Sequence, residues 1–164
     1  MIGVRYNHTF TEEEGPEYRW MVVRHPLDRL VSCWAFFCNS ETPLEIDGQH
    51  DIKTLGYRYG MPFDEFLDIA IESHAKNAHT EKQILYAGNH KFDRLCRLEN
   101  IAAEWSALRK RFLILKRPLI VTHQSKHGHW SEYYSDLQSE KAMNVFAEDL
   151  ELYHRADKNP PVQE

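Results

Sequence analysis

Arg24 and Ser32 flank the start of an amphipathic segment, where an arginine and a hydroxyl could together bind a phosphate group. Residues 20–23, just before them, are apolar and partly β-branched, which predicts a short buried strand. Pro26 suits the first position of a helix, and Asp28 would lie in its first turn, where the dipole favours a negative charge. Arg24 would then follow the carboxyl end of a strand, beside a helix N-terminus. Open α/β sheets bind ligands at this place, and anions favour it.

The size and composition of the chain predict one globular domain. Its 164 residues are 42% hydrophobic, and we expect the domain to span residues 1–156, followed by a flexible tail over 157–164. A net charge of −5 argues against a broad nucleic-acid surface. No apolar run approaches the roughly 20 residues that span a bilayer, and residues 1–10 do not read as a signal peptide.

The cysteines are odd in number and lack the spacing of metal ligands. Cys33, Cys38 and Cys96 are therefore predicted to be core thiols in a cytoplasmic or other reducing, soluble compartment.

Hydrophobic periodicity predicts the remaining elements. Residues 39–60 are rich in turn-forming residues and are predicted to form a long surface loop. Helices are predicted from Pro62, over 81–87 and from Glu99, and strands over 92–98 and 119–122. One last helix is predicted to follow a capping box formed by Ser135 and Gln138. Its apolar stripe consists of Met143, Phe146, Leu150 and Tyr153. The order predicts an α/β fold with a small, mostly parallel sheet flanked by helices.

Residues 24–32, RHPLDRLVS, resemble the phosphate-binding segment of the sulfotransferase superfamily, Arg-x-Pro-x-x-Arg-Leu-x-Ser after a strand. The resemblance implies that Arg24 and Ser32 hold the 3′-phosphate of the donor, 3′-phosphoadenosine 5′-phosphosulfate. We expect the strand-to-helix turn to fold Arg24 back over the helix toward Ser32. Arg29 is expected to form a structural ion pair. The likeness covers nearly all of residues 1–154 and continues in segments 63–67, 79–83, 92–100, 133–136 and 146–150.

The resemblance is to the carbohydrate branch of the superfamily, the Golgi-type and heparan-type enzymes and their relatives. It implies a carbohydrate hydroxyl as acceptor and His8 as the base that takes the hydroxyl proton. Alternatively, His8 is a surface histidine or a capping histidine. His79 would contact the substrate or, alternatively, cap a helix.

A dense polar cluster occupies residues 123–129. The resemblance implies that Ser125 and Lys126 contribute to the 3′-phosphate site. His123, His127 and His129 could instead bind a metal, but no nearby Asp, Glu or Cys completes a ligand set, so no metal is predicted. As a third alternative to phosphate contact and metal binding, residues 123–129 form a solvated loop.

Members of the superfamily hold the 5′-phosphosulfate on a loop resembling Pro-Lys-x-Gly-Thr-Thr, and we expect the fold here to lack it. Neither that motif nor Gly-x-x-x-x-Gly-Lys-Ser/Thr occurs in the sequence. Three explanations stay open: a degenerate relative, a loop supplied by a partner protein or a second copy that also completes the sheet edge, or a donor held differently. Two functions follow, sulfuryl transfer or a non-catalytic scaffold or binding subunit of a larger assembly.

Overall fold

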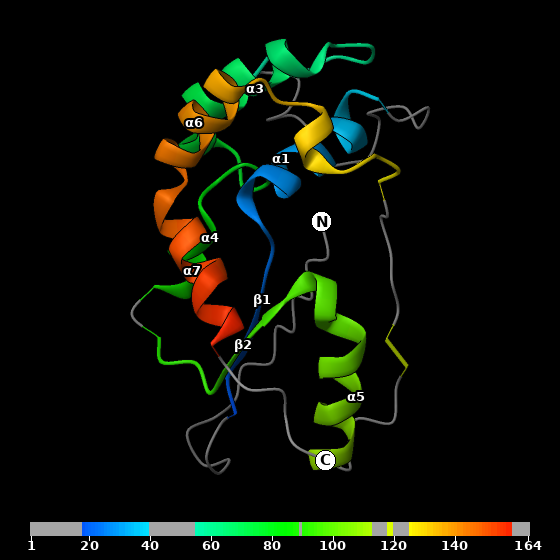
Figure 1. Cartoon of the computed structure of the whole chain (residues 1–164), viewed down its shortest axis with the longest axis vertical. Coiled ribbons are helices and arrows are strands. Elements are labelled where there is room, and N and C mark those ends of the chain that lie inside the picture. The colour runs from blue at the N-terminus through cyan, green and yellow to red at the C-terminus, as the bar shows by residue number, and fades with distance from the viewer. Residues whose placement is uncertain (1–17, 40–54, 89, 113–117, 120–124, 159–164) are drawn as a thin grey trace.

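The computed structural model describes residues 18–39, 55–88, 90–112, 118–119 and 125–158 (Figure 1). The strands are β1 (Trp20–Val23) and β2 (Arg94–Arg97). The helices are α1 (Pro26–Phe37), α3 (Phe63–Glu72), α4 (Gln83–Ala87), α5 (Ile101–Arg111), α6 (Asp136–Val145) and α7 (Ala147–Asp157). Three short 3₁₀ turns are η1 (His74–Lys76), η2 (Leu98–Asn100) and η3 (Trp130–Glu132).

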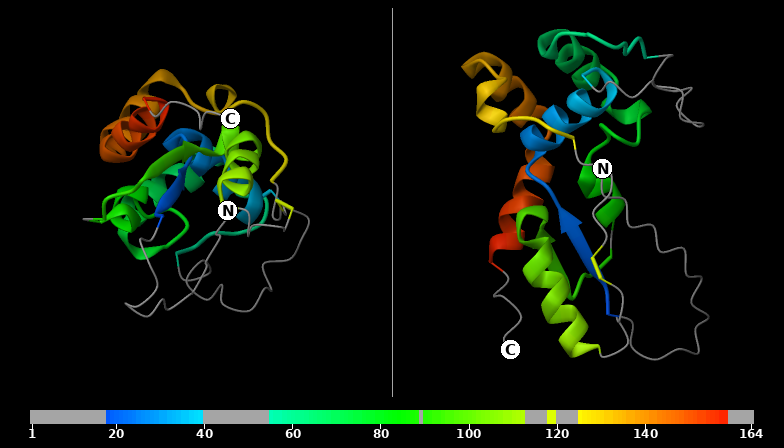
Figure 2. Two further views of the ribbon diagram at one scale, coloured as in Figure 1. Left: turned by 90° about the horizontal axis from the view of Figure 1, so that it is seen from below. Right: turned by 90° about the vertical axis from the view of Figure 1, so that its right-hand side faces the viewer.

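Strands β1 and β2 form a parallel pair, and together they confirm the predicted α/β class. Trp20 is aligned with Arg94 and Val23 with Arg97, so both strands end at the same edge. Helix α7 packs against both strands, and α5 packs against β2 (Figure 2). Parallel strands need a crossover connection, which the chain supplies through α1, α3 and α4.

Helices α1, α3 and α6 pack on one another beyond the carboxyl end of β1 and enclose the larger hydrophobic core (Figure 1). The predicted apolar face of α3 is buried as expected, from Phe63 to Ile71. Helix α1 begins at Pro26, as its sequence predicts, and buries Leu27, Leu30 and Val31 in this core. The packing of α1 therefore fixes the direction in which the chain leaves β1.

A smaller core joins the sheet to α7. Val23 and Leu95 of the two strands pack with Leu152, Tyr153 and Ala156 of α7. Val23 directly precedes Arg24 in the chain, so its packing against α7 helps to fix the end of β1.

The prediction of one last helix was wrong, because the chain breaks at Phe146 into α6 and α7. Phe146 has φ −103° and ψ 27°, outside the helical region, and its ring is buried in the larger core. Leu152 and Tyr153 belong instead to the smaller core. Because of the break, the buried apolar residues of α6 and Phe146 pack in the larger core, and those of α7 pack in the smaller core. The predicted capping box of Ser135 and Gln138 is confirmed.

The other predicted elements occur with shifted ends. The helix predicted over 81–87 begins at Gln83 and stops at Gly88, whose φ of 50° is easily adopted by glycine. The strand predicted over 92–98 spans Arg94–Arg97, and η2 precedes the helix that was predicted from Glu99. Residues 40–54 of the predicted loop and 120–122 of the predicted strand lie outside the described residues.

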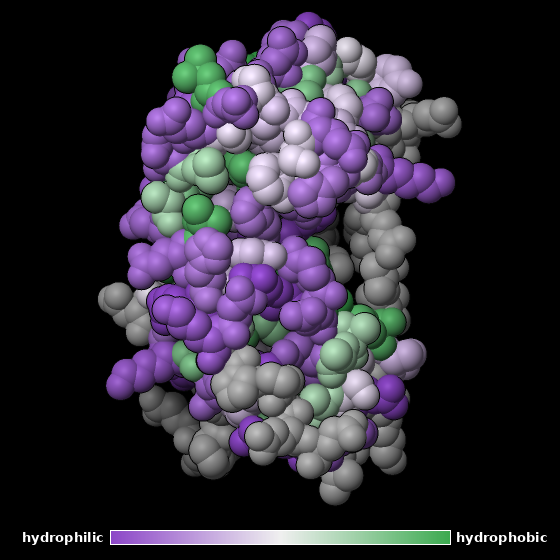
Figure 3. All heavy atoms as spheres, in the orientation of Figure 1, coloured by the Kyte–Doolittle hydropathy of each residue, from purple (hydrophilic) through white to green (hydrophobic). Residues whose placement is uncertain are grey.

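The face of the molecule in Figure 3 is mostly hydrophilic over α7, with scattered hydrophobic residues. The three cysteines are buried and form no disulfide, which confirms their predicted place in the core. Among the helices of the described ranges, none has the length and apolar character needed to cross a membrane.

Candidate functional site

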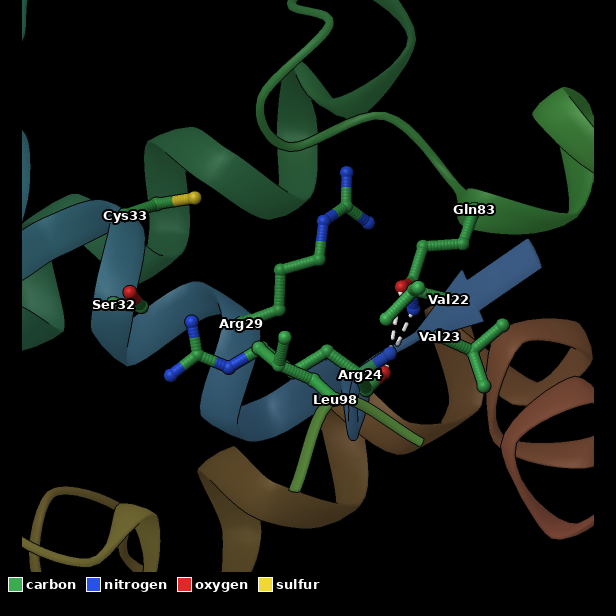
Figure 4. Close-up of a pocket in the computed structure, with 8 residues that line it drawn as sticks. All are labelled: Val22, Val23, Arg24, Arg29, Ser32, Cys33, Gln83 and Leu98. Atoms are coloured by element: carbon green, nitrogen blue, oxygen red, sulfur yellow. Dashed lines mark hydrogen bonds between the residues drawn. The ribbon is translucent and has the colours of Figure 1, made fainter. Parts of the chain in front are cut away.

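Arg24 and Ser32 line one small cavity, at the place where β1 passes into α1 (Figure 4). The Arg24 side chain extends along α1 toward Ser32, as predicted, while that of Arg29 rises toward the segment before α4. The cavity measures about 90 Å³ and is lined by Val22, Val23, Arg24, Arg29, Ser32, Cys33, Gln83 and Leu98.

The side-chain amide of Gln83 clamps the backbone of Arg24. The backbone N–H of Arg24 donates to Gln83 Oε1 at 3.0 Å, and Gln83 Nε2 donates to the Arg24 carbonyl at 2.8 Å (Figure 4). Gln83 is buried, so water competes little for these bonds. The amide thus continues the hydrogen bonding of β1 beyond its last residue and fixes the origin of the Arg24 side chain.

A fully buried carboxylate holds Gln83 in place. Asp149 of α7 accepts hydrogen bonds from the backbone N–H groups of Gln83, at 2.8 Å, and of Ile84, at 2.9 Å. The same carboxylate lies 3.5 Å from Arg29 NH1. A buried charge needs such partners, and these three join α7, α4 and α1.

Arg29 is held by protein groups on several sides. Its NH2 group donates to the carbonyls of His79, at 3.0 Å, and of Glu81. With Asp149, these contacts confirm the predicted structural ion pair. Arg29 also lines the cavity, with its charge paired to that of Asp149.

The guanidinium of Arg24 lies between a carboxylate and an imidazole. Its Nε donates to Asp28 Oδ2 at 2.5 Å, and its NH2 lies 3.3 Å from His127 Nε2. Asp28 belongs to the first turn of α1, so the helix that begins at Pro26 also orients Arg24.

The segment 125–129 crosses the same site. The Ser125 hydroxyl oxygen lies 2.5 Å from that of Ser32, within hydrogen-bonding distance. Ser125 is therefore placed beside the predicted phosphate ligands. Lys126 is exposed, and among the described residues no ion pair joins it to the cavity wall, so its predicted role stays a prediction.

The two described histidines of the predicted cluster make separate contacts. His127 approaches Arg24, and His129 Nδ1 lies 2.7 Å from the Ser131 hydroxyl. His123 lies outside the described residues. Within the ranges that the structure describes, no three His, Cys, Asp or Glu side chains are grouped as metal ligands would be.

His79 lies beside the site but presents its backbone to it. Its carbonyl accepts from Arg29 NH2 and from Cys33 Sγ, the latter at 3.3 Å. The ring packs edge-on against Phe37 at 5.0 Å between centroids, and burial lowers the pKa of the imidazole. The alternative that His79 caps a helix was wrong, because the residue that precedes α4 is Lys82. The substrate contact of His79 stays a prediction. His8, the predicted base, lies outside the described residues.

The ring of His25 packs between two aromatic side chains. It stacks on Trp130 at 5.0 Å and meets Tyr153 edge-on at 5.2 Å. Burial is the main cause that lowers the pKa of His25. Burial also raises the pKa of the Cys33 thiol in the cavity wall, which keeps it uncharged.

The comparison of the sequence with protein families decides the identity of this fold. The sequence profile described as Sulfotransferase family matches residues 4–155, most of the chain. The chain belongs to the sulfotransferase family. No match was found among curated proteins or among solved structures.

Sulfotransferases typically use 3′-phosphoadenosine 5′-phosphosulfate, and the cavity can be tested against its parts. Arg24, Arg29 and Ser32 together line this cavity of about 90 Å³. The Arg24 guanidinium and the Ser32 hydroxyl supply hydrogen-bond donors to such an anion. The residues present in this sulfotransferase therefore fit a single phosphate group of the donor.

Gln83 and Asp149 are the positioning residues to which sequence analysis gave no role. Both lie in segments that resemble the family, 79–83 and 146–150. Nothing in the sequence indicates that Gln83 and Asp149 are in contact, since 66 residues separate them along the chain.

Proposed function

We propose that this sulfotransferase binds 3′-phosphoadenosine 5′-phosphosulfate and transfers its sulfuryl group to a carbohydrate hydroxyl. The observation that carries the proposal is the convergence of Arg24 and Ser32 on one cavity at the carboxyl end of β1. An arginine beside a helix N-terminus suits a phosphate group.

In this proposal the 3′-phosphate lies against Arg24 and Ser32. Ser125 offers a second hydroxyl, and Lys126 adds a positive charge from the surface. Gln83 and Asp149 hold the backbone around Arg24, so that its side chain needs little reorganisation on binding.

The donor, when bound, supplies an activated sulfuryl group, with 3′-phosphoadenosine 5′-phosphate as the leaving group. His8 accepts the proton of the attacking hydroxyl, for which a group that titrates near neutrality is suited. His79 contacts the acceptor. The carbohydrate class of the acceptor is supported by the resemblance of the segments named above and belongs to the proposal.

The second candidate is a non-catalytic scaffold or binding subunit that works with a partner chain. It is favoured by the internal pairing of the site: Arg24 contacts Asp28, and Arg29 contacts the buried Asp149. These pairs neutralise the cations without a ligand, so the same residues also serve to hold the fold together.

A transfer assay separates the two candidates. The full chain is incubated with 3′-phosphoadenosine 5′-phosphosulfate and a panel of oligosaccharides, and mass spectrometry detects a sugar heavier by one sulfuryl group. We expect His8→Ala to abolish transfer and keep nucleotide binding, whereas His90→Gln, on an exposed residue, keeps both. Nucleotide binding without transfer to any acceptor, together with a complex larger than the monomer in light scattering, would establish the second candidate instead.

A further inference from the structure

The two ring nitrogens of His127 face groups of opposite hydrogen-bonding character. Nε2 lies 3.3 Å from Arg24 NH2, and Nδ1 lies 2.8 Å from the carbonyl oxygen of Gly128. Arginine only donates hydrogen bonds, and a carbonyl only accepts them. Both contacts are hydrogen bonds when the proton is on Nδ1 and the lone pair of Nε2 accepts from Arg24. In this tautomer the ring of His127 is a neutral imidazole.

A phosphate bound at Arg24 would need Nε2 of His127 to donate a hydrogen bond instead of accepting one. Phosphate oxygens are acceptors, and so is the lone pair of Nε2, so a neutral ring in this tautomer repels an anion that is bound to the same guanidinium. Protonation of Nε2 turns the repulsion into a charge-assisted hydrogen bond. Without the anion, the same protonation would place two cations against each other.

We propose that His127 is a ligand of the phosphate and binds it as an imidazolium, so that each binding event takes up a proton from solvent on Nε2. The inference rests on the proposed function, since it assumes that the phosphate lies at Arg24. It adds a ligand and a proton to that site. Segment 125–129 then contributes two side chains to the anion, because Ser125 already reaches Ser32.

The surroundings of His127 allow both of its charge states. In the described part of the chain, the charged and titratable groups around the ring and its segment include Arg24, Asp28, Lys126, His129, Glu132 and Tyr133. Asp28 offsets one positive charge when the anion is absent. Histidine changes its charge between about pH 5 and pH 8, so the uptake is measurable near neutrality.

Calorimetry tests the proposal with 3′-phosphoadenosine 5′-phosphate in buffers that differ in ionisation enthalpy. Three proteins are compared: wild type, His127→Gln, which cannot titrate, and His90→Gln, the exposed control. The phosphate itself titrates with a second pKa of about 6, and the comparison with His127→Gln subtracts that contribution.

We expect wild type and His90→Gln to take up more protons near neutral pH than His127→Gln does. Near pH 6, wild type should bind about tenfold or more tightly than His127→Gln, the ratio given by a charge-assisted hydrogen bond. The difference should shrink when the pH is raised to about 8.5, where histidine is neutral.

Equal proton uptake and equal pH dependence in wild type and His127→Gln would overturn the inference, while the binding itself would leave the proposed function standing. Failure of the wild type to bind the nucleotide at any pH would overturn both. NMR titration of the imidazoles in the wild-type chain needs no variant and covers the case of a misfolded His127→Gln. It should show His127 neutral when free and protonated when bound near neutral pH; a neutral ring in the complex contradicts the inference.

Discussion

The hydroxyl oxygens of Ser32 and Ser125 lie 2.5 Å apart, although 93 residues separate them along the chain. The contact joins helix α1 to the segment before η3, beside the cavity that Ser32 lines. The segment 125–129 therefore lies next to the site, and the role of Ser125 as a phosphate ligand stays a prediction.

Replacing Ser125 should weaken nucleotide binding modestly. A neutral hydrogen bond contributes about 0.5–1.5 kcal/mol, so Ser125→Ala should raise the Kd for 3′-phosphoadenosine 5′-phosphate roughly 2- to 12-fold in calorimetry. Ser106→Ala, on the exposed side of α5, is the matched control and should bind as wild type does. An unchanged Kd in Ser125→Ala would assign the Ser32–Ser125 contact to folding alone.

Asp149 and its neighbour Glu148 form a matched pair for stability measurements. Asp149→Asn should lower the free energy of unfolding by about 3–5 kcal/mol, because it leaves Arg29 without its buried counter-charge. Glu148 is 61% exposed and pairs with Lys82 at 2.8 Å, so Glu148→Gln should cost about 1 kcal/mol or less. Urea unfolding followed by circular dichroism measures both. If the two variants lowered the free energy of unfolding by similar amounts, the positioning role of Asp149 would be contradicted.

The buried histidines predict how stability depends on pH. Burial lowers the pKa of both His25 and His79 below the ordinary value of 6.5, so the unfolded chain takes up protons first as the pH falls. Their contribution to stability is therefore complete above about pH 6.5 and is lost progressively below it. The thermal midpoint should decrease as the pH is lowered from about 7.5 to about 5.5.

Removing the titrating group should flatten that dependence. His25→Phe keeps an aromatic ring between Trp130 and Tyr153 and cannot be protonated. Its thermal midpoint should decline less than that of wild type over the same range, whereas His90→Gln should follow wild type. A decline equal to that of wild type in His25→Phe would show that His25 does not contribute to it.

Local signals in the sequence were enough to predict the first part of the site. The apolar run of β1, the proline at position 26 and the apolar spacing of α1 together place Arg24 at the turn from strand to helix and Ser32 within the helix that follows. Each of these features acts over a few residues, which is why it can be read from the sequence.

The rest of the site depends on contacts between distant segments. Nothing local to Gln83 indicates that its amide binds the backbone of Arg24, and nothing local to Phe146 indicates a break in its helix. The stripe of Met143, Phe146, Leu150 and Tyr153 keeps helical spacing across that break, so periodicity alone predicts one helix. Tertiary packing decides both features. Gln83 of α4 binds the backbone that follows β1, and Phe146 packs in the larger core between α6 and α7.

The binding of 3′-phosphoadenosine 5′-phosphate to Arg24 tests the central claim most directly. Calorimetry compares wild type with Arg24→Ala, and with Arg58→Ala as a control, since Arg58 pairs with Glu65 and is 58% exposed. Loss of one charged hydrogen-bonded contact should cost about 1.5–3 kcal/mol, which is roughly 10- to 150-fold in Kd. Adenosine 5′-monophosphate, which lacks the 3′-phosphate, should bind wild type and Arg24→Ala alike. Equal affinity of wild type and Arg24→Ala for 3′-phosphoadenosine 5′-phosphate, or no binding by wild type at millimolar nucleotide, would contradict the account.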